Sequence, residues 1–476
     1  MYALIYFDTE DYFSPPDSPV HRLPGQLAEI MTRHGLPGCF HIHGEKARFM
    51  ERHEQTDVIE AVSKHDVSLH FDRGSVHPTT AEEVSQLGWF EGVARVLFRE
   101  VPGFQALERI FGRCSAITRH GGTLAAPIIY ACGMLGKPYF HSPFRLPGRN
   151  VAWYCNALTI GGYQAGWHFD RVYRDTPAFE EQLARVDDYL QQRARTHDYT
   201  AMFGCHPLIT VMKQFPDAVN FRHGAAPPPS RWKAPEMVDD VSIPTMLRNF
   251  ERLVMTLVEQ PNVEWTTVAG IDELYGARPA RVNDAIVLQG AERVLDAGGP
   301  TFTDELTAAE LLFLLALRVL DERQWWEVPQ VMGPLAEPSA PPVADGSALP
   351  IEPVAEEIVR ACRASGYLPA QLSAGNGSLR LEQAMLLLAS HALGHAPEVS
   401  DRQPSYAETI PGVADALEIV RGCEDWRAHG QQFNLRGITE PFLRQCWTLK
   451  PAFTVREYQA GVEPGRQLNP MFDRPL

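Results

Sequence analysis

The sequence predicts an α/β protein in which parallel strands and helices alternate around a barrel-like sheet, followed by a mainly α-helical C-terminal domain. Residues 3–7 are an apolar run typical of a short buried strand, and similar runs alternate with helical patterns up to about residue 276. Such alternation favours parallel strands joined by right-handed crossovers. From about residue 300 helical patterns predominate. We therefore expect a barrel over residues 1–285 and a helical domain with an extended tail over residues 300–476.

Each predicted element has its own local signal. After the first strand, the pattern predicts strands at 38–44, 65–71, 117–122, 139–141, 200–207 and 263–268, and helices at 48–63, 126–135, 246–259 and from 271. In the C-terminal part, Thr307 and Glu310 form a capping-box signature before a helix at 311–320. Further helices are predicted at 354–365 and 379–393, after a proline-rich segment.

Composition excludes several classes of function. The 476-residue chain has a formal net charge of −16, which argues against nucleic acid and anionic membranes as general partners. No apolar run is long enough for a membrane span, and the N-terminus does not read as a secretory signal. The eight cysteines include no Cys-x-x-Cys pair, a pattern typical of reduced thiols. These observations predict a cytoplasmic location.

Three carboxylates end the first predicted strand. Because side chains alternate along a strand, Asp8 and Glu10 share one face, whereas Asp11 points away unless the strand has already broken. Two carboxylates on one face repel each other unless a cation lies between them or one of them is protonated. This strand end is therefore a candidate site for metal binding or acid–base chemistry.

Five motifs in order resemble the polysaccharide-deacetylase family, also called carbohydrate esterase family 4, across residues 3–276. They are Phe-Asp-Thr-Glu-Asp at 7–11, Gly-Glu-Lys-Ala at 44–47, His70 with His77-Pro78, Arg-His-Gly-Gly at 119–122 and Phe-Gly-Cys-His-Pro at 203–207. The resemblance implies a distorted (β/α) barrel and a divalent metal, zinc by preference, that one acid and two histidines hold.

The resemblance also implies a role for each matched residue. Asp8 would be the catalytic base, Arg119 would hold its carboxylate in place, and His206 would protonate the leaving nitrogen. Glu10 would be the metal carboxylate, with Asp11 as the alternative, and His70 would be the first histidine ligand.

The sequence departs from the family pattern at the second histidine ligand. The family motif His-x-x-x-His would place this ligand at position 74, where the chain has Gly74. His77 is the provisional substitute, because three residues span at most about 10 Å. Histidines also stand at positions 41, 43 and 120, where the family has other residues; we expect His43 and His120 to line the substrate pocket, and all three are rivals to His77. Either the ligand set is rearranged or the metal is lost.

The leading functional prediction is a metal-dependent hydrolase of a non-peptide C–N bond that removes acetyl groups from an amino-sugar substrate. One alternative is a metal-free amide or cyclic-amide hydrolase of the same fold, and another is a degenerate, non-catalytic barrel that binds carbohydrate. We expect the C-terminal domain to act in dimerisation or as a lid; it resembles pseudomurein-binding repeats only at an apolar helix followed by Leu368-Pro369. Aromatic residues near the site are predicted mainly as core, namely Trp153, Tyr154, Tyr163 and Trp167, with His168 beside them.

Overall fold

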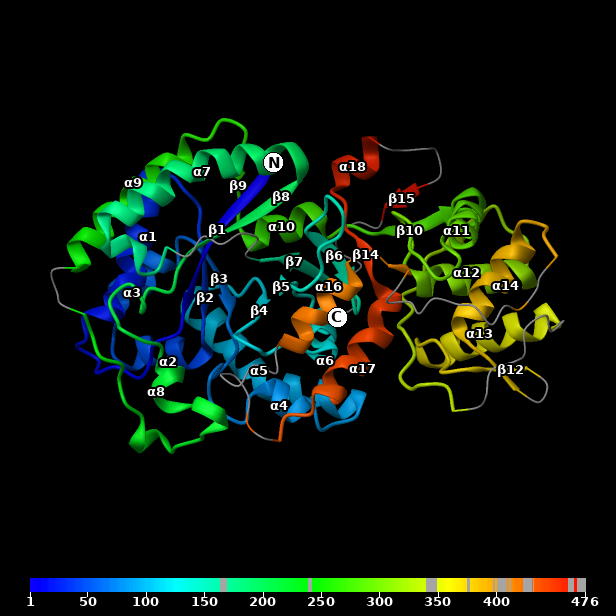
Figure 1. Cartoon of the computed structure of the whole chain (residues 1–476), viewed down its shortest axis with the longest axis horizontal. Helices are drawn as coiled ribbons and strands as arrows, with labels where there is room; N and C mark the ends of the chain where they lie inside the picture. The colour runs from blue at the N-terminus through cyan, green and yellow to red at the C-terminus, as the bar shows by residue number, and fades with distance from the viewer. Residues whose placement is uncertain are drawn as a thin grey trace.

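A curled, mostly parallel sheet with helices on its outside forms the larger part of the molecule (Figure 1). The computed structural model describes residues 1–162, 169–238, 242–339, 349–374, 377–396, 399, 409–410, 412–422, 430, 432–460 and 466–468. In these residues the main sheet has ten strands in the order β14-β6-β7-β5-β4-β3-β2-β1-β8, with β9 also paired to β1. This arrangement confirms the predicted α/β fold with a barrel-like, mostly parallel sheet.

The strands and helices of the barrel follow the predicted order, with some additions. The strands are β1 (Tyr2–Thr9), β2 (Cys39–Ile42), β3 (Asp66–Leu69), β4 (Ile117–Thr118), β5 (Tyr139–Ser142), β6 (Val151–Tyr154), β7 (Ala157–Gly161), β8 (Tyr199–Cys205) and β9 (Glu264–Trp265). The helices include α1 (Leu23–His34), α2 (Gly44–Arg52), α3 (Thr56–Val62), α4 (Thr80–Val84), α5 (Trp89–Phe111), α6 (Ala126–Met134), α7 (Thr176–Thr196), α9 (Ser242–Val258) and α10 (Val268–Tyr275). The single helix predicted at 48–63 is two helices, α2 and α3.

Alternation along β1 decides which side chains reach the interior of the barrel. Leu4 and Tyr6 belong to the smaller apolar cluster, on the concave side of the sheet, whereas Ile5 and Phe7 belong to the larger cluster that the outer helices share. Asp8 continues the face of Leu4 and Tyr6, so the strand delivers its carboxylate to the inner side of the sheet. Trp153 and Tyr154 are buried in these clusters as predicted, whereas Tyr163, Trp167 and His168 lie outside the described residues.

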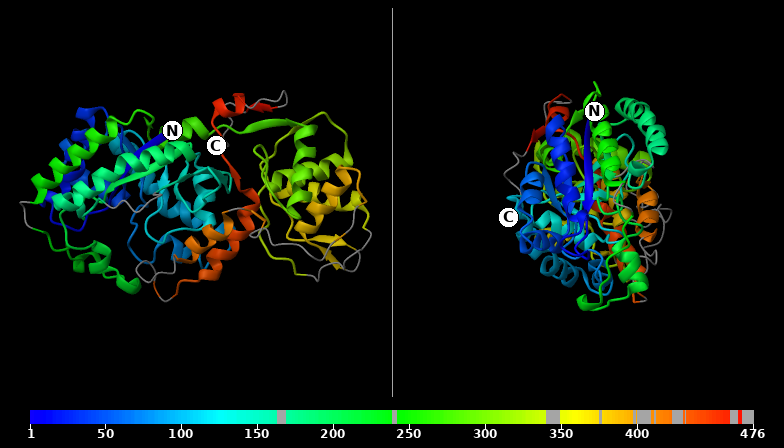
Figure 2. Two further views of the ribbon diagram at one scale, coloured as in Figure 1. Left: turned by 45° about the horizontal axis from the view of Figure 1, so that its top comes forward. Right: turned by 90° about the vertical axis from the view of Figure 1, so that its left-hand side faces the viewer.

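A helical lobe stands beside the barrel (Figures 1 and 2). It contains β10 (Pro279–Asn283), α11 (Asp284–Ala297), α12 (Ala308–Leu320), β11 (Trp325–Glu327), α13 (Ile351–Ser365), β12 (Leu372–Ala374), β13 (Gly377–Leu379) and α14 (Leu381–Ala392). The predicted capping box of α12 is present, since the Glu310 backbone donates to Thr307 Oγ1 and the Thr307 backbone donates to Glu310 Oε2. Helix α11 runs through the predicted boundary, and the division into two domains stays a prediction.

The last part of the chain returns to the barrel. Helices α16 (Val413–Arg421) and α17 (Leu435–Gln445) lie against it, and β14 (Lys450–Pro451) pairs with β6 (Figure 1). Phe442 of α17 stacks on Phe144, and Tyr154 donates a hydrogen bond of 2.8 Å to the Phe442 carbonyl. After β14 come α18 (Val455–Ala460) and β15 (Arg466–Leu468), which pairs with β10. In the described residues, no helix is long and apolar enough to cross a membrane.

Candidate active site

The carboxylate of Asp8 lies between two histidines. Strands β1 and β2 pair in a register that sets Asp8 beside His41, and His41 Nδ1 lies 3.0 Å from Asp8 Oδ1. On the other side, His206 Nε2 lies 3.7 Å from Asp8 Oδ2. Burial alone would raise the pKa of Asp8, but His70, His41 and His206 lower it well below its ordinary value. Asp8 is therefore an ionised carboxylate.

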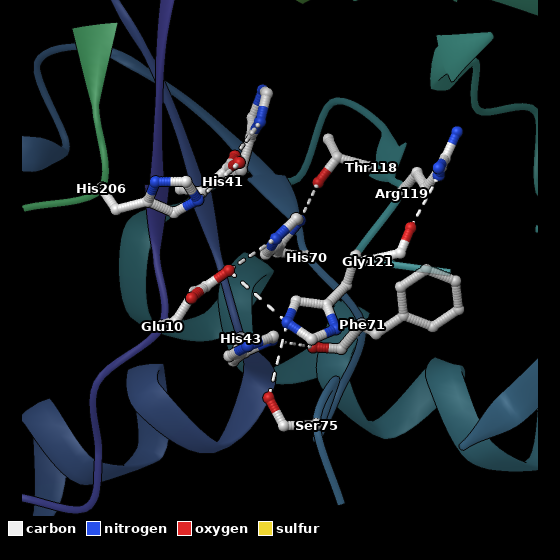
Figure 3. A network of polar contacts seen from close by, with 12 residues as sticks. Glu10, His41, His43, His70, Phe71, Ser75, Thr118, Arg119, Gly121 and His206 are labelled. Carbon is white, nitrogen blue, oxygen red and sulfur yellow. Dashed lines mark hydrogen bonds and ion pairs between the residues drawn. The ribbon is translucent and has the colours of Figure 1, made fainter. Parts of the chain in front are cut away.

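Glu10 lies next to two further imidazoles (Figure 3). Its Oε1 atom is 3.2 Å from Nε2 of His70 and 3.5 Å from Nε2 of His120. His70 follows β3 in the chain, and His120 follows β4. All three side chains are buried, and their three ligand atoms lie within 4.8 Å of one another. Burial, together with the negative charges of Asp8 and Asp170, raises the pKa of Glu10 to about 7. Without a cation, this carboxylate is therefore in an unfavourable place for its ionised form.

The hydrogen bonds of His70 test whether a cation fits. Thr118 Oγ1 donates to the Leu69 carbonyl at 3.3 Å, so its oxygen is left to accept from His70 Nδ1 at 2.8 Å. In the neutral ring, His70 Nε2 then carries a lone pair, and this lone pair faces the Glu10 carboxylate. Two facing acceptors are unfavourable unless a proton or a metal cation lies between them. A second nitrogen fixed by a hydrogen bond is also the usual arrangement of a metal-binding histidine, so these residues fit a divalent metal.

The structure gives a reason for glycine at position 74. A Cβ atom added there would overlap Cε1 of His43 and lie 2.8 Å from Cγ of His120. The two rings contact each other edge to face, at 4.9 Å between centroids, and His43 stacks on His70 at 5.2 Å. The space that a ligand at position 74 would need is thus filled by histidines from neighbouring strand ends.

His206 forms a pair with an acid that sequence reasoning missed. Its Nδ1 lies 3.1 Å from Asp170 Oδ2, and its backbone N–H donates to Asp170 Oδ1 at 2.7 Å. Burial opposes a charge on His206, but Asp170, Glu10 and Asp8 raise its pKa to about 10. His206 is therefore an imidazolium at neutral pH. Asp170 lies 36 residues earlier in the chain and in no motif, so no local signal marked it.

Two predicted residues lie apart from the Glu10 group. His77 Nδ1 is 2.7 Å from Glu82 Oε2, and in the described residues His77 belongs to no cluster of potential metal ligands. Asp11 accepts hydrogen bonds from the backbone of Phe13 and Ser14, at 3.0 and 3.3 Å, and is also absent from those clusters. Glu10 thus belongs to the group of potential metal ligands and Asp11 does not, in line with the alternation of side chains along the strand.

Arg119 does not bond to Asp8 in this structure. Its Nε donates to the Gly121 carbonyl at 2.8 Å, and Figure 3 shows its guanidinium directed away from Glu10 and His70. His41 takes the place beside Asp8 that the family pattern gives to the arginine. The sequence had marked His41 only as a residue of the pocket.

Two cavities meet at Glu10 and His206. The first, about 360 Å³, reaches toward β5, and its lining includes Asp8, His70, Arg119, His141, Phe144, Arg145 and, from α16, Ile419. The second, about 280 Å³, includes Gly74, Ser75, His77, His120, Asp217 and Phe221. The predicted pocket residues differ in position, because His120 lines the second cavity whereas His43 is buried behind it. His43 Nδ1 donates a hydrogen bond of 3.2 Å to the Phe71 carbonyl.

Comparisons with known proteins give the following similarities. No family model and no curated protein matches the chain. Among solved structures, the chain is similar to a protein assigned as a polysaccharide deacetylase from Mycobacterium smegmatis, with 11% identity, a TM-score of 0.35, and coverage of 57% of this chain and 89% of the other. A family 4 carbohydrate esterase from Streptomyces lividans, in complex with acetate, matches at 13% identity and a TM-score of 0.29, covering 55% and 90%. A family 4 acetyl xylan esterase from Clostridium thermocellum, in complex with a cobalt ion, matches at 9% identity and a TM-score of 0.28, covering 57% and 90%.

Proposed function

We propose that the protein is a metal-dependent hydrolase of a non-peptide amide bond, and that its substrate is an N-acetylated amino sugar. The observation that carries this proposal is the convergence of Glu10, His70 and His120 beside an ionised Asp8 and a protonated His206. One carboxylate and two imidazoles are a usual ligand set for catalytic zinc, which keeps a further position open. When bound, such an ion supplies Lewis acidity and lowers the pKa of a water ligand.

The remaining groups of the site suit the proton transfers of amide hydrolysis. Asp8 is ionised and takes a proton from the attacking water. Its Oδ1 is held by His41, so this step uses Oδ2, which lies 3.7 Å from His206 Nε2 and makes no hydrogen bond with it. His206 holds its proton because Asp170 binds the other ring nitrogen, and Nε2 donates that proton to the leaving nitrogen as the C–N bond breaks. Water and amide thus give a carboxylate and an amine.

Metal content and acetate release test the proposal together. We expect the purified protein to bind about one zinc-type ion per chain and to release acetate from N-acetylated amino sugars. His70→Ala and His120→Ala should each remove the metal, whereas His395→Ala, an exposed histidine of the helical lobe, should not. Asp8→Asn should keep the metal and lose activity.

Each other outcome argues for another function. Acetate release by a protein that binds no metal would favour the metal-free amide hydrolase. Carbohydrate binding without any hydrolysis, in the metal-loaded protein, would favour the non-catalytic barrel.

A further inference from the structure

Arg119 lines the first cavity and does not contact Asp8, the partner that the family pattern predicts for it. His41 occupies the position beside Asp8, and its ring is fully buried and stacks on Tyr6. Within the described residues, the Arg119 side chain makes one hydrogen bond, which Nε donates to the carbonyl of Gly121 in its own loop. This bond fixes the direction of the guanidinium and leaves its other N–H groups for a ligand.

Arg145 lines the same cavity, in the loop that follows β5. In the described part of the chain, no carboxylate lies within ion-pair distance of Arg119 or Arg145. Some other partly buried arginines do have acidic partners, since Arg48 pairs with Asp72, Arg99 with Glu83, and Arg149 with Asp198. Arg119 is half-buried and Arg145 is exposed, and neither charge is neutralised by a carboxylate of the described residues, although the chain has an excess of acids.

Apolar and aromatic side chains also line this cavity. Tyr6, Phe144 and Phe203 line it, and the returning helix α16 adds Ile419. A ligand in this cavity would thus border Asp8, His70 and His206 as well as Arg119 and Arg145. An apolar wall lowers the local dielectric and strengthens a charge-assisted hydrogen bond at its edge. A guanidinium binds carboxylate or phosphate through two parallel N–H groups.

We propose that Arg119 and Arg145 bind an anionic substituent, a carboxylate or a phosphate, on the substrate whose amide lies at Asp8 and His206. The inference rests on the proposed function and narrows its substrate class to acidic N-acetylated amino sugars. The arginines orient the substrate and take no part in the proton transfers. His141 also lines this cavity.

Matched substrates test the inference. The probes are N-acetylglucosamine, its phosphate monoester and N-acetylmuramic acid, which adds a carboxylate to the same N-acetylated ring. We expect kcat/KM for one of the two anionic compounds to exceed that of the neutral sugar by about tenfold or more. The anionic compound with the higher kcat/KM shows whether the two arginines bind a phosphate or a carboxylate. Arg119→Gln and Arg145→Gln should each reduce this ratio, whereas Arg113→Gln, an exposed arginine outside the cavity, should leave the ratio unchanged. Equal kcat/KM values for all three compounds would overturn the inference.

Binding to an inactive variant separates this inference from the proposed function. Calorimetry on metal-loaded Asp8→Asn protein measures the affinity for each compound without turnover. Tighter binding of an anionic compound, lost with Arg119→Gln in the same background, would support the anion site even if no acetate is released by the native protein. Equal binding of all three compounds would refute it even if the native protein is an active deacetylase.

Discussion

Replacement of Gly74 tests the ligand arrangement most directly. Histidine at this position would restore the family motif, and on sequence grounds it would be expected to complete a metal site. The structure predicts the opposite, because a Cβ atom at this position overlaps His43 Cε1 and lies 2.8 and 2.9 Å from Cγ and Nδ1 of His120. Both neighbours belong to buried imidazole rings, which have little room to move.

The size of the effect follows from this overlap. An inserted methyl group in a packed interior costs about 1–3 kcal/mol, so Gly74→Ala should lower the free energy of unfolding by about that amount. If the His120 ring moves instead, its Nε2 leaves Glu10 and the metal affinity should fall about tenfold or more. Gly74→His should have a larger effect of both kinds. Because the φ angle of Gly74 is not positive, the effect is steric and owes nothing to backbone strain.

The assay combines thermal or denaturant unfolding with metal titration by competition with a chelator. Gly422→Ala is the matched control, since a Cβ atom there meets no other atom within 4 Å and its backbone is helical. His43→Ala in the Gly74→Ala background removes the closest overlap and should recover part of the stability. If Gly74→His binds metal as tightly as the native protein and unfolds at the same temperature, the proposed packing of His43 and His120 around position 74 is wrong.

Three further predictions concern ligands, positioning and pH. His77→Ala should leave the metal content unchanged while His120→Ala removes the metal, as elemental analysis would show; the reverse result would restore the assignment from the sequence. His41→Asn should raise the pKa of Asp8, because an interaction that lowers it is lost, so the acidic limb of the kcat/KM profile should move to higher pH; an unmoved limb argues against His41 as a positioning residue. Burial raises the pKa of Glu100 from 4.5 to about 7, so the folded state binds this proton more tightly than the unfolded state. Its contribution to stability should be complete below pH 4.5 and lost as the pH rises to about 7, a fall of about 3 kcal/mol that Glu100→Gln should not show in urea unfolding.

The sequence by itself determined the barrel and the position of the two acids. An apolar run that ends in carboxylates is typical of a buried strand that ends at the rim of a sheet, and the period of two sets Asp8 and Glu10 on one face. The same local reasoning located His70 and His206, since each directly follows a strand. These inferences needed only the pattern within a few residues.

Tertiary structure decided which of these side chains meet. The register between β1 and β2 sets Asp8 beside His41, whereas the Arg119 side chain donates a hydrogen bond within its own loop. The path of the loop after β3 turns His77 toward Glu82, while the end of β4 brings His120 to Glu10. Strand register and loop paths depend on contacts between segments far apart in the chain, and spacing along one sequence does not encode those distances.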